Sequence, residues 1–189
     1  MTGTITEPGS PGKIIKLKAP VGINELKNLR AGDEVSLSGY LLGARDEAHK
    51  RMVKSLEKNE KLPVELKNQV IFYLGPSPVP PGKSSGSIGP TTSSRMDNLT
   101  EPLLKSGVSA AIGKGERSLK TKKLFKKYMA VYFVAPGGVS AYLARKVKKI
   151  DQAAYKDLGP EAIFRLEVED LPLFVAYDIH GGDVFHSAI

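Results

Sequence analysis

Three short apolar runs in the middle of the chain, each ended by a glycine or a proline, constrain the fold more than any other feature. They span residues 70–74, 108–112 and 129–135. Each has the length and the flanking turn signals of a buried strand rather than those of a helix. Charged segments with one apolar side separate the runs. This alternation of strands and helices is typical of an α/β domain with parallel strands.

Towards the two ends of the chain the pattern changes. Residues 14–17 and 35–42 alternate apolar and polar side chains, which predicts two strands with one buried face. Residues 163–171 and 173–177 predict two further strands in close succession. Strand pairs at the ends combined with alternating strands and helices in the middle favour a mixed sheet with flanking helices over a purely parallel sheet.

Amphipathic segments predict the helices that cover this sheet. They lie at 45–59, 116–127 and 139–147. Thr91, Thr92 or Ser93 is a candidate N-cap for one further helix, and Thr100 for another that ends at Ser106.

The domain organisation follows from composition. Residues 1–12 consist largely of Gly, Pro, Ser and Thr, which predicts a disordered lead-in. Residues 13–189 contain neither an internal repeat nor a domain boundary, so we expect a single domain. A domain of this length buries enough surface to fold without disulfide bonds.

Composition also limits the chemistry available to the chain. There is no cysteine, which excludes a disulfide scaffold, a thiolate zinc site and an iron–sulfur cluster held by this chain alone. No apolar run has the length of a membrane helix, and the N-terminus lacks the apolar core of a secretory signal. We therefore expect a cytoplasmic protein. The net charge of +8 favours anionic partners or substrates.

Two polar segments are candidates for an anion site. Arg45 follows a predicted strand and lies at the N-terminus of a predicted helix, where its guanidinium fork suits a carboxylate. The alternative is an Asp46 cap with Arg45 in a surface ion pair. Residues 89–97 combine four hydroxyl groups with Arg95 beside a helix start, which suits an oxyanion or a dicarboxylate. The alternative there is a Ser/Thr-rich loop with a capped helix.

Two further features favour ordinary interpretations. Gly82-Lys83-Ser84 lacks the spacing of a phosphate-binding loop, and the prolines before it remove the backbone N–H groups that such a loop needs. Residues 114–127 carry a charge of +7 − 1 = +6, which raises nucleic-acid binding as a possibility. Aromatic residues do not interleave with these charges, so a solvated basic helix face is the favoured interpretation.

Five segments in a fixed order carry a family resemblance. They are GARDEAHKRM (43–52), VIFYLGP (70–76), GPTTSSRMD (89–97), AAIGKG (110–115) and EAIFRLEVEDLPLFVAYDIHGGDVF (161–185). From about residue 15 to its end, the chain resembles the C-terminal domain, or separate β subunit, of class I fumarate hydratase and of the related L-tartrate dehydratase. The resemblance implies a swivelling β/β/α domain. It also implies a hydro-lyase that interconverts (S)-malate with fumarate and water, or acts on L-tartrate.

The resemblance further implies a cofactor and a partner. In this family a [4Fe–4S] cluster on the α subunit or N-terminal domain binds the substrate hydroxyl and carboxylate. A stand-alone β subunit without cysteine would bind no cluster itself and would be active only with a cysteine-containing α subunit. Self-association is a further expectation. Two alternatives stay open: a non-catalytic module that binds anions or nucleic acid, and a self-sufficient metal-free enzyme.

By matched position, five residues resemble the substrate-contacting residues of the family: Arg45, Thr91, Thr92, Arg95 and Lys114. The three cations would neutralise the two carboxylates, Thr91 would remove the C3 proton, and Asp46 and His49 would orient Arg45. Thr91 and Lys114 are thus the expected catalytic residues. Ser94 and Glu116 stand where the family often has glycine. We expect 43–46, 75–95 and 113–115 to form one concave, cationic, solvent-open face.

Overall fold

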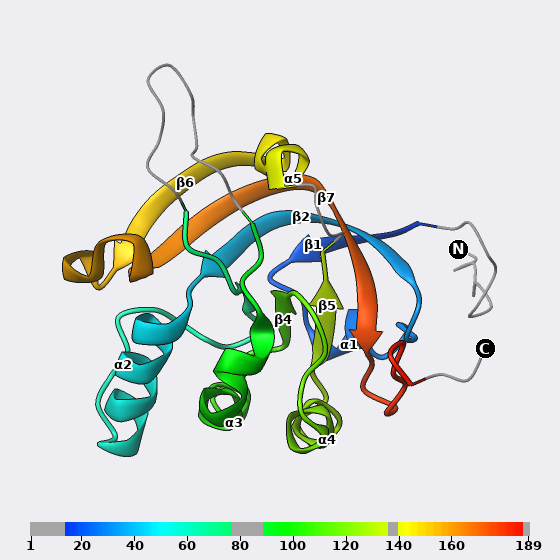
Figure 1. Ribbon diagram of the computed structural model, residues 1–189, viewed down its shortest axis with the longest axis horizontal. Helices are drawn as coiled ribbons and strands as arrows, with labels where there is room; N and C mark the ends of the chain where they lie inside the picture. Colours follow the sequence, from blue (N-terminus) through cyan, green and yellow to red (C-terminus); the bar gives the residue numbers. More distant parts are fainter. Residues whose placement is uncertain (1–13, 77–88, 136–139, 187–189) are drawn as a thin grey trace.

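The computed structural model describes residues 14–76, 89–135 and 140–186. Within them a mixed sheet of seven strands has the order β1-β2-β3-β4-β5-β7-β6 (Figure 1). The strands are β1 (Ile15–Ala19), β2 (Glu34–Gly43), β3 (Val70–Phe72), β4 (Ala110–Gly113), β5 (Val131–Val134), β6 (Val147–Ala154) and β7 (Ile163–Tyr177). Neighbours from β1 to β5 are parallel, whereas β7 is antiparallel to β2, β5 and β6. The predicted mixed sheet is confirmed.

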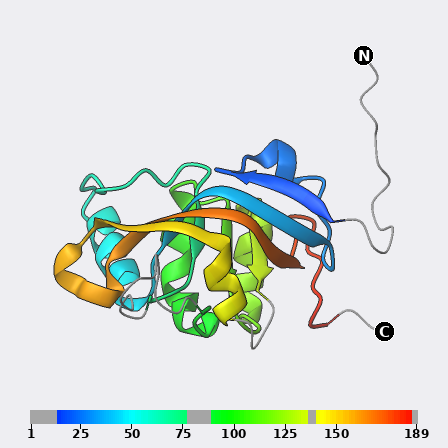
Figure 2. The same ribbon diagram turned by 90° about the horizontal axis from the view of Figure 1, so that it is seen from above.

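Helices join the strands. The α-helices are α1 (Ile23–Leu26), α2 (Asp46–Glu57), α3 (Asp97–Lys105), α4 (Leu119–Lys127) and α5 (Ser140–Lys146). Two 3₁₀ helices, η1 (Ser93–Met96) and η2 (Lys156–Glu161), precede α3 and β7. Figure 1 shows α2, α3 and α4 side by side beneath β4 and β5, while β2, β6 and β7 arch above them. Viewed from above, these three long strands run next to one another (Figure 2).

β7 closes the sheet on itself, because it pairs with β2 over Glu34↔Phe174 to Gly43↔Phe164 and with β5 near its end. The resulting ring encloses one hydrophobic core, which contains Leu37, Phe72 and Phe133 among other residues. A second core lies between β3–β5 and the helices. The described residues therefore form two strand layers and one helix layer.

The central strands are apolar throughout because both of their faces are buried. In β3, Val70 and Phe72 belong to the core inside the ring, while Ile71 belongs to the core under the helices. Such two-sided burial is what turns the sequence pattern of a strand into a continuous apolar run. It explains why all three central runs could be recognised as strands.

Other predictions need correction. The expected strands at 163–171 and 173–177 are one strand, β7, which continues through Pro172. The helix expected at 116–127 begins only at Leu119, because the Ser118 hydroxyl accepts the Thr121 N–H and caps it. Thr100 lies inside α3 rather than at its start, and none of Thr91, Thr92 and Ser93 makes a side-chain cap. β6 was not predicted.

Two predictions fall on residues outside those that the structure describes. They are the disordered lead-in at 1–12 and the interpretation of Gly82-Lys83-Ser84 as an ordinary loop segment. Within the described part of the chain, no helix has the length and apolar character needed to cross a bilayer.

Candidate active site

The candidate site is built on the carboxyl ends of three neighbouring parallel strands, β2, β3 and β4. The backbone pairing continues beyond the strands: Ala44 N donates to Phe72 O at 3.1 Å, and Tyr73 N donates to Ile112 O at 2.8 Å. Because parallel strands end at the same edge of a sheet, the residues that follow them lie together. Arg45, Gly75 and Lys114 are the residues that these strand ends present.

The Thr-rich segment is inserted between the ends of β3 and β4. Thr91 N donates to Tyr73 O at 2.8 Å, and Thr92 forms a parallel bridge with Lys114. The buried Ser93 completes the junction, since its hydroxyl accepts the Lys114 N–H at 2.9 Å. Thr91, Thr92 and Lys114 are therefore neighbours in the structure.

Gly113 has to be a glycine for this junction to form. A Cβ at this position would lie 1.8 Å from the Ser93 hydroxyl oxygen, which no side-chain adjustment of Ser93 alone would relieve without breaking its bond to Lys114. The absence of a side chain thus lets the Thr-rich segment approach β4 closely.

Arg45 reaches the same edge from β2. Its guanidinium lies against the backbone of Gly75, where a Cβ would be only 2.7 Å from Nε. The terminal nitrogen NH2 forms an ion pair with Glu161 at 3.0 Å. Nε is buried and has no hydrogen-bond partner among the described residues. The half-buried Arg45 thus uses NH2 for Glu161, while its Nε–H makes no hydrogen bond to the described residues.

Arg95 extends from η1 towards the start of α2, where it forms an ion pair with Asp46 at 2.9 Å. Its side chain is half exposed. The ion pair links the Thr-rich segment to the element that carries Arg45. The structure therefore brings all five predicted substrate contacts to one edge of the sheet, supplied by three separate segments.

The two residues expected to orient Arg45 do not contact its guanidinium. Asp46 pairs with Arg95 instead. The Nδ1 of His49 lies 3.1 Å from the Arg45 carbonyl oxygen, so His49 holds the backbone and not the side chain. The carboxylate that does reach the guanidinium belongs to Glu161, which the sequence did not single out.

His49 is fully buried, and its ring meets the ring of Tyr73 edge-on with centroids 5.3 Å apart. Burial lowers the pKa of His49 to about 4, although the hydrogen bond to the Arg45 carbonyl favours the charged form. The imidazole is therefore neutral near pH 7. It is a packed support beneath the site rather than an exposed acid or base.

This burial predicts acid sensitivity. Because the pKa of His49 in the folded chain, about 4, lies below the ordinary histidine pKa of 6.5, the full contribution to stability is present above pH 6.5 and is lost as the pH falls towards 4. The pKa shift corresponds to roughly 3 kcal/mol. We expect His49→Asn, which can keep a donor to the Arg45 carbonyl, to flatten this pH dependence in urea unfolding between pH 7 and pH 4. If the free energy of unfolding of His49→Asn fell with pH as steeply as that of the wild type, His49 would not be the source of the acid sensitivity.

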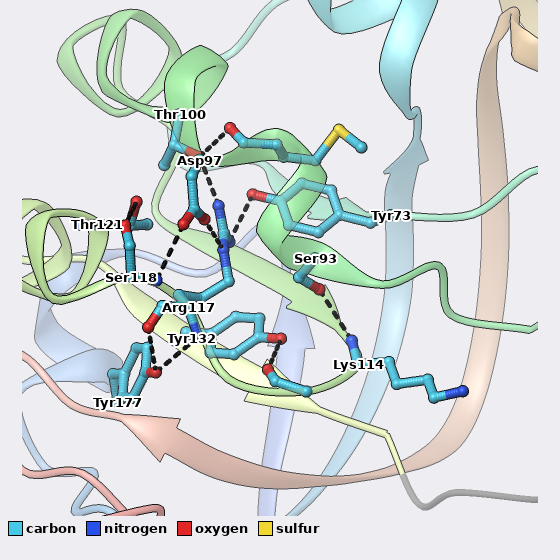
Figure 3. A network of polar contacts seen from close by, with 12 residues as sticks. Tyr73, Ser93, Asp97, Thr100, Lys114, Arg117, Ser118, Thr121, Tyr132 and Tyr177 are labelled. Carbon is cyan, nitrogen blue, oxygen red and sulfur yellow. Dashed lines mark hydrogen bonds and ion pairs between the residues drawn. The ribbon is translucent and has the colours of Figure 1, made fainter.

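A buried polar network centred on Arg117 lies beside the loop of residues 114–118, which joins β4 to α4 and is called the Lys114 loop (Figure 3). The Nε of Arg117 lies 2.5 Å from an oxygen of Asp97, and its NH2 donates to the Thr100 hydroxyl at 2.7 Å. The guanidinium also lies 5.3 Å from the ring centroid of Tyr73. The side chain of Arg117 is completely buried. Asp97 and Thr100 belong to α3, so the network ties the loop to that helix.

The network also holds the loop backbone. The Tyr177 hydroxyl accepts the Arg117 N–H at 2.9 Å, and the Tyr132 hydroxyl donates to Gly115 O at 2.7 Å. Asp97 accepts the Ser118 N–H at 2.9 Å. Burial alone would raise the pKa of Asp97, but the hydrogen bonds from Arg117 and Ser118 hold this pKa below its ordinary value. The loop is thus fixed while the side chain of Lys114 points away from the network (Figure 3).

Arg117 corrects the interpretation of the basic segment. It does not belong to a solvated face, because it is buried among three aromatic rings. Two of the lysines on α4 have acidic partners: Lys122 pairs with Asp183, and Lys127 pairs with Glu101. Leu119, the first residue of α4, is 68% exposed and does not pack on the core. The segment is therefore less available for nucleic acid than its charge indicates.

The donor set does not fit an iron–sulfur cluster bound by this chain alone. Such a cluster is held by cysteine thiolates, and the sequence contains no cysteine. The described residues also contain no group of three or more His, Asp or Glu side chains that could hold a metal ion. What the site offers is cations and hydroxyl groups, which suit the binding of carboxylates.

Comparison with known proteins identifies the family. A family model described as Fumarase C-terminus matches residues 4–188. The chain is 42% identical over 169 residues to the putative L(+)-tartrate dehydratase subunit beta of Methanocaldococcus jannaschii, covering 86% of this chain and 87% of that protein. It is 38% identical over 182 residues to fumarate hydratase 1, mitochondrial, of Leishmania major, covering 94% of this chain and 33% of that protein.

A third relative is the aerobic class I fumarate hydratase of Salmonella typhimurium, which is 36% identical over 167 residues, covering 87% of this chain and 29% of that protein. The chain thus spans about a third of the length of these fumarate hydratases but most of the length of the tartrate dehydratase subunit. These matches confirm the resemblance found in the sequence motifs. The chain belongs to the Fumarase C-terminus family.

Proposed function

We propose that this chain is the β subunit of a class I, iron–sulfur-dependent fumarate hydratase of the cytoplasm, and that it supplies half of the active site. The observation that carries the proposal is the meeting of Arg45, Arg95 and Lys114 with Thr91 at one edge of the sheet. Because the chain lacks thiolates, we place the [4Fe–4S] cluster on a cysteine-containing α subunit. In the matched relatives of full fumarate hydratase length, this domain accounts for about a third of the protein.

In this proposal the cations bind the two carboxylates of (S)-malate or fumarate. Arg45 and Arg95 each already have one protein carboxylate, whereas Lys114 has no ion pair among the described residues. The buried Nε–H of Arg45 has no hydrogen-bond partner among the residues that the structure describes. Fixed donors that are aimed at a carboxylate stabilise the negative charge that grows on it when the neighbouring carbon loses a proton.

Thr91 is the proposed acceptor of the C3 proton. An alcohol is a very weak base, so it needs nearby cations and the exclusion of water to act. The Thr92–Lys114 bridge places the lysine beside this threonine segment. Thr91 itself is half-buried in the isolated chain, and docking of a partner on this edge would exclude the remaining water.

L-tartrate is the second candidate substrate. The specific observation in its favour is that this chain and the tartrate dehydratase subunit of M. jannaschii match over nearly their whole lengths. Tartrate and malate differ by one hydroxyl group, and a few polar contacts decide such preferences. Ser94 and Glu116, both exposed near the site, are the positions where this chain differs from the usual family pattern.

The test is reconstitution. The chain is mixed anaerobically with its separately produced α subunit, loaded with iron and sulfide, and fumarate absorbance is followed after addition of (S)-malate. L-tartrate is the second substrate in a parallel assay of product formation. We expect activity on (S)-malate in the mixture and none with either subunit alone. Inactivity of a properly loaded mixture on both acids would mean that the family relationship carries the fold without the reaction.

A further inference from the structure

The start of α2 has an unusual arrangement at its N-cap. Arg45 is the N-cap residue, with extended backbone angles and no side-chain cap. An arginine has only donors, so it cannot satisfy the free N–H groups of the first helical turn. The Glu47 N–H is satisfied instead by Glu161, whose Oε2 accepts it at 2.9 Å. The cap of α2 is thus supplied from η2, 114 residues further along the chain.

The same carboxylate binds the guanidinium of Arg45. Oε1 of Glu161 lies 3.0 Å from NH2 of Arg45, while Oε2 stays on the Glu47 N–H. Both contacts are charge-assisted, and the positive end of the helix dipole adds to them. The side chains of Arg45 and Glu161 are only 27% and 24% exposed, so the geometry is restricted by packing. One carboxylate therefore couples the helix start to the orientation of the guanidinium.

The other side of the guanidinium is fixed by backbone. It rests against Gly75 at the end of β3, and its Nε–H remains without a partner among the described residues. Glu161 on one side and Gly75 on the other hold the guanidinium in one place, and neither of them accepts a hydrogen bond from Nε. A guanidinium that is oriented before a ligand arrives loses less freedom when it binds a carboxylate.

We infer that Glu161 is the positioning residue for Arg45: it sets the orientation in which the guanidinium meets a substrate carboxylate. The inference about substrate rests on the proposed function, but the positioning itself does not. A purely structural role of Glu161 as a helix cap would leave the guanidinium where it is, as long as the domain stays folded.

The chain contains a matched control. Asp157, also in η2, binds Arg51 of α2 through two hydrogen bonds of 2.8 and 2.7 Å. This pair links the same two elements through the same chemical groups. Asp157→Ala therefore removes an η2–α2 ion pair without touching Arg45.

The first experiment needs no activity. In the isolated chain, the Nε–Hε signal of Arg45 is assigned by its disappearance in Arg45→Lys and then followed by NMR in Glu161→Ala, Glu161→Gln and Asp157→Ala. We expect Glu161→Ala to shift and broaden the signal, Glu161→Gln to do so less, and Asp157→Ala to leave it unchanged. An unchanged Arg45 signal in a folded Glu161→Ala variant would overturn the inference.

The second experiment uses the complex with the α subunit. We expect Glu161→Ala to raise the KM for (S)-malate by about 10- to 100-fold, the range for loss of a hydrogen bond to a charged group, with a smaller change in kcat. Asp157→Ala should change neither constant. A fall in kcat alone, in proportion to the folded fraction, would show a structural role only and overturn the inference. If the wild-type complex is inactive on both acids, the proposed function fails while the NMR result still decides the positioning of Arg45.

Discussion

Lys114→Met is expected to lower kcat/KM of the reconstituted enzyme by about 100- to 1000-fold, the cost typical of losing one preorganised donor to developing charge. The backbone of Lys114 is held through the Ser93 hydroxyl and the Ser93 N–H, and neither contact uses its side chain. The side chain is exposed, so the substitution removes the charge and leaves the fold intact. Steady-state kinetics on (S)-malate, together with thermal unfolding of the variant, separates these two effects.

Lys123→Met is the matched control for this prediction. Lys123 is an exposed lysine of α4 and does not belong to the candidate site at the carboxyl ends of β2, β3 and β4. Its replacement removes the same charge from the protein, so it reports on general electrostatic effects. Comparable losses in both variants, or retention of wild-type kcat/KM in Lys114→Met, would contradict the role given to Lys114.

Arg117→Ala is expected to destabilise the chain by about 3–5 kcal/mol, because removing one member of a buried ion pair leaves the other uncompensated. Asp97 would lose the guanidinium while remaining tied to the Ser118 N–H. The loss should be measured by urea unfolding of the isolated chain. Arg51→Ala, which breaks an exposed pair with Asp157, should cost no more than about 1 kcal/mol.

The double variant sharpens this test. The double variant Arg117→Met, Asp97→Asn is compared with Arg117→Met alone and Asp97→Asn alone. If the cost comes from an unpaired buried group, the double variant should lose clearly less free energy of unfolding than the sum of the losses in these two single variants. Additive costs would mean that Arg117 stabilises the domain through its three aromatic contacts rather than through Asp97.

The sequence predicts the central strands well and the outer ones poorly, for a physical reason. β3, β4 and β5 are buried on both faces, so every residue contributes to the signal. β6 is exposed along most of its length and buries little besides Val147 and Ala154. Its sequence is therefore rich in charged residues and shows no apolar pattern that would predict a strand. Pro172 looks like a strand break, but the structure accommodates it opposite Ser36 within β7.

The candidate site shows the same division. Motifs locate Arg45, the Thr-rich segment and Lys114, because these residues lie within short recognisable stretches. They do not reveal which residues hold them. Glu161 is 116 positions from Arg45, and in the sequence Arg117 is one cation in a basic run. Burial and partner choice depend on the closed sheet, which local patterns do not encode. The mixed sheet with flanking helices is observed, whereas the assignment to the swivelling β/β/α type, implied by the resemblance, stays a prediction.

The central claim is that the residues at the carboxyl ends of β2, β3 and β4 bind the substrate carboxylates. The most direct test is a crystal structure of the complex with the α subunit, soaked with (S)-malate. We predict that at least one substrate carboxylate lies within hydrogen-bond distance of Arg45, and that Arg95 or Lys114 reaches the other. A ligand bound with none of these three side chains in contact would contradict the claim.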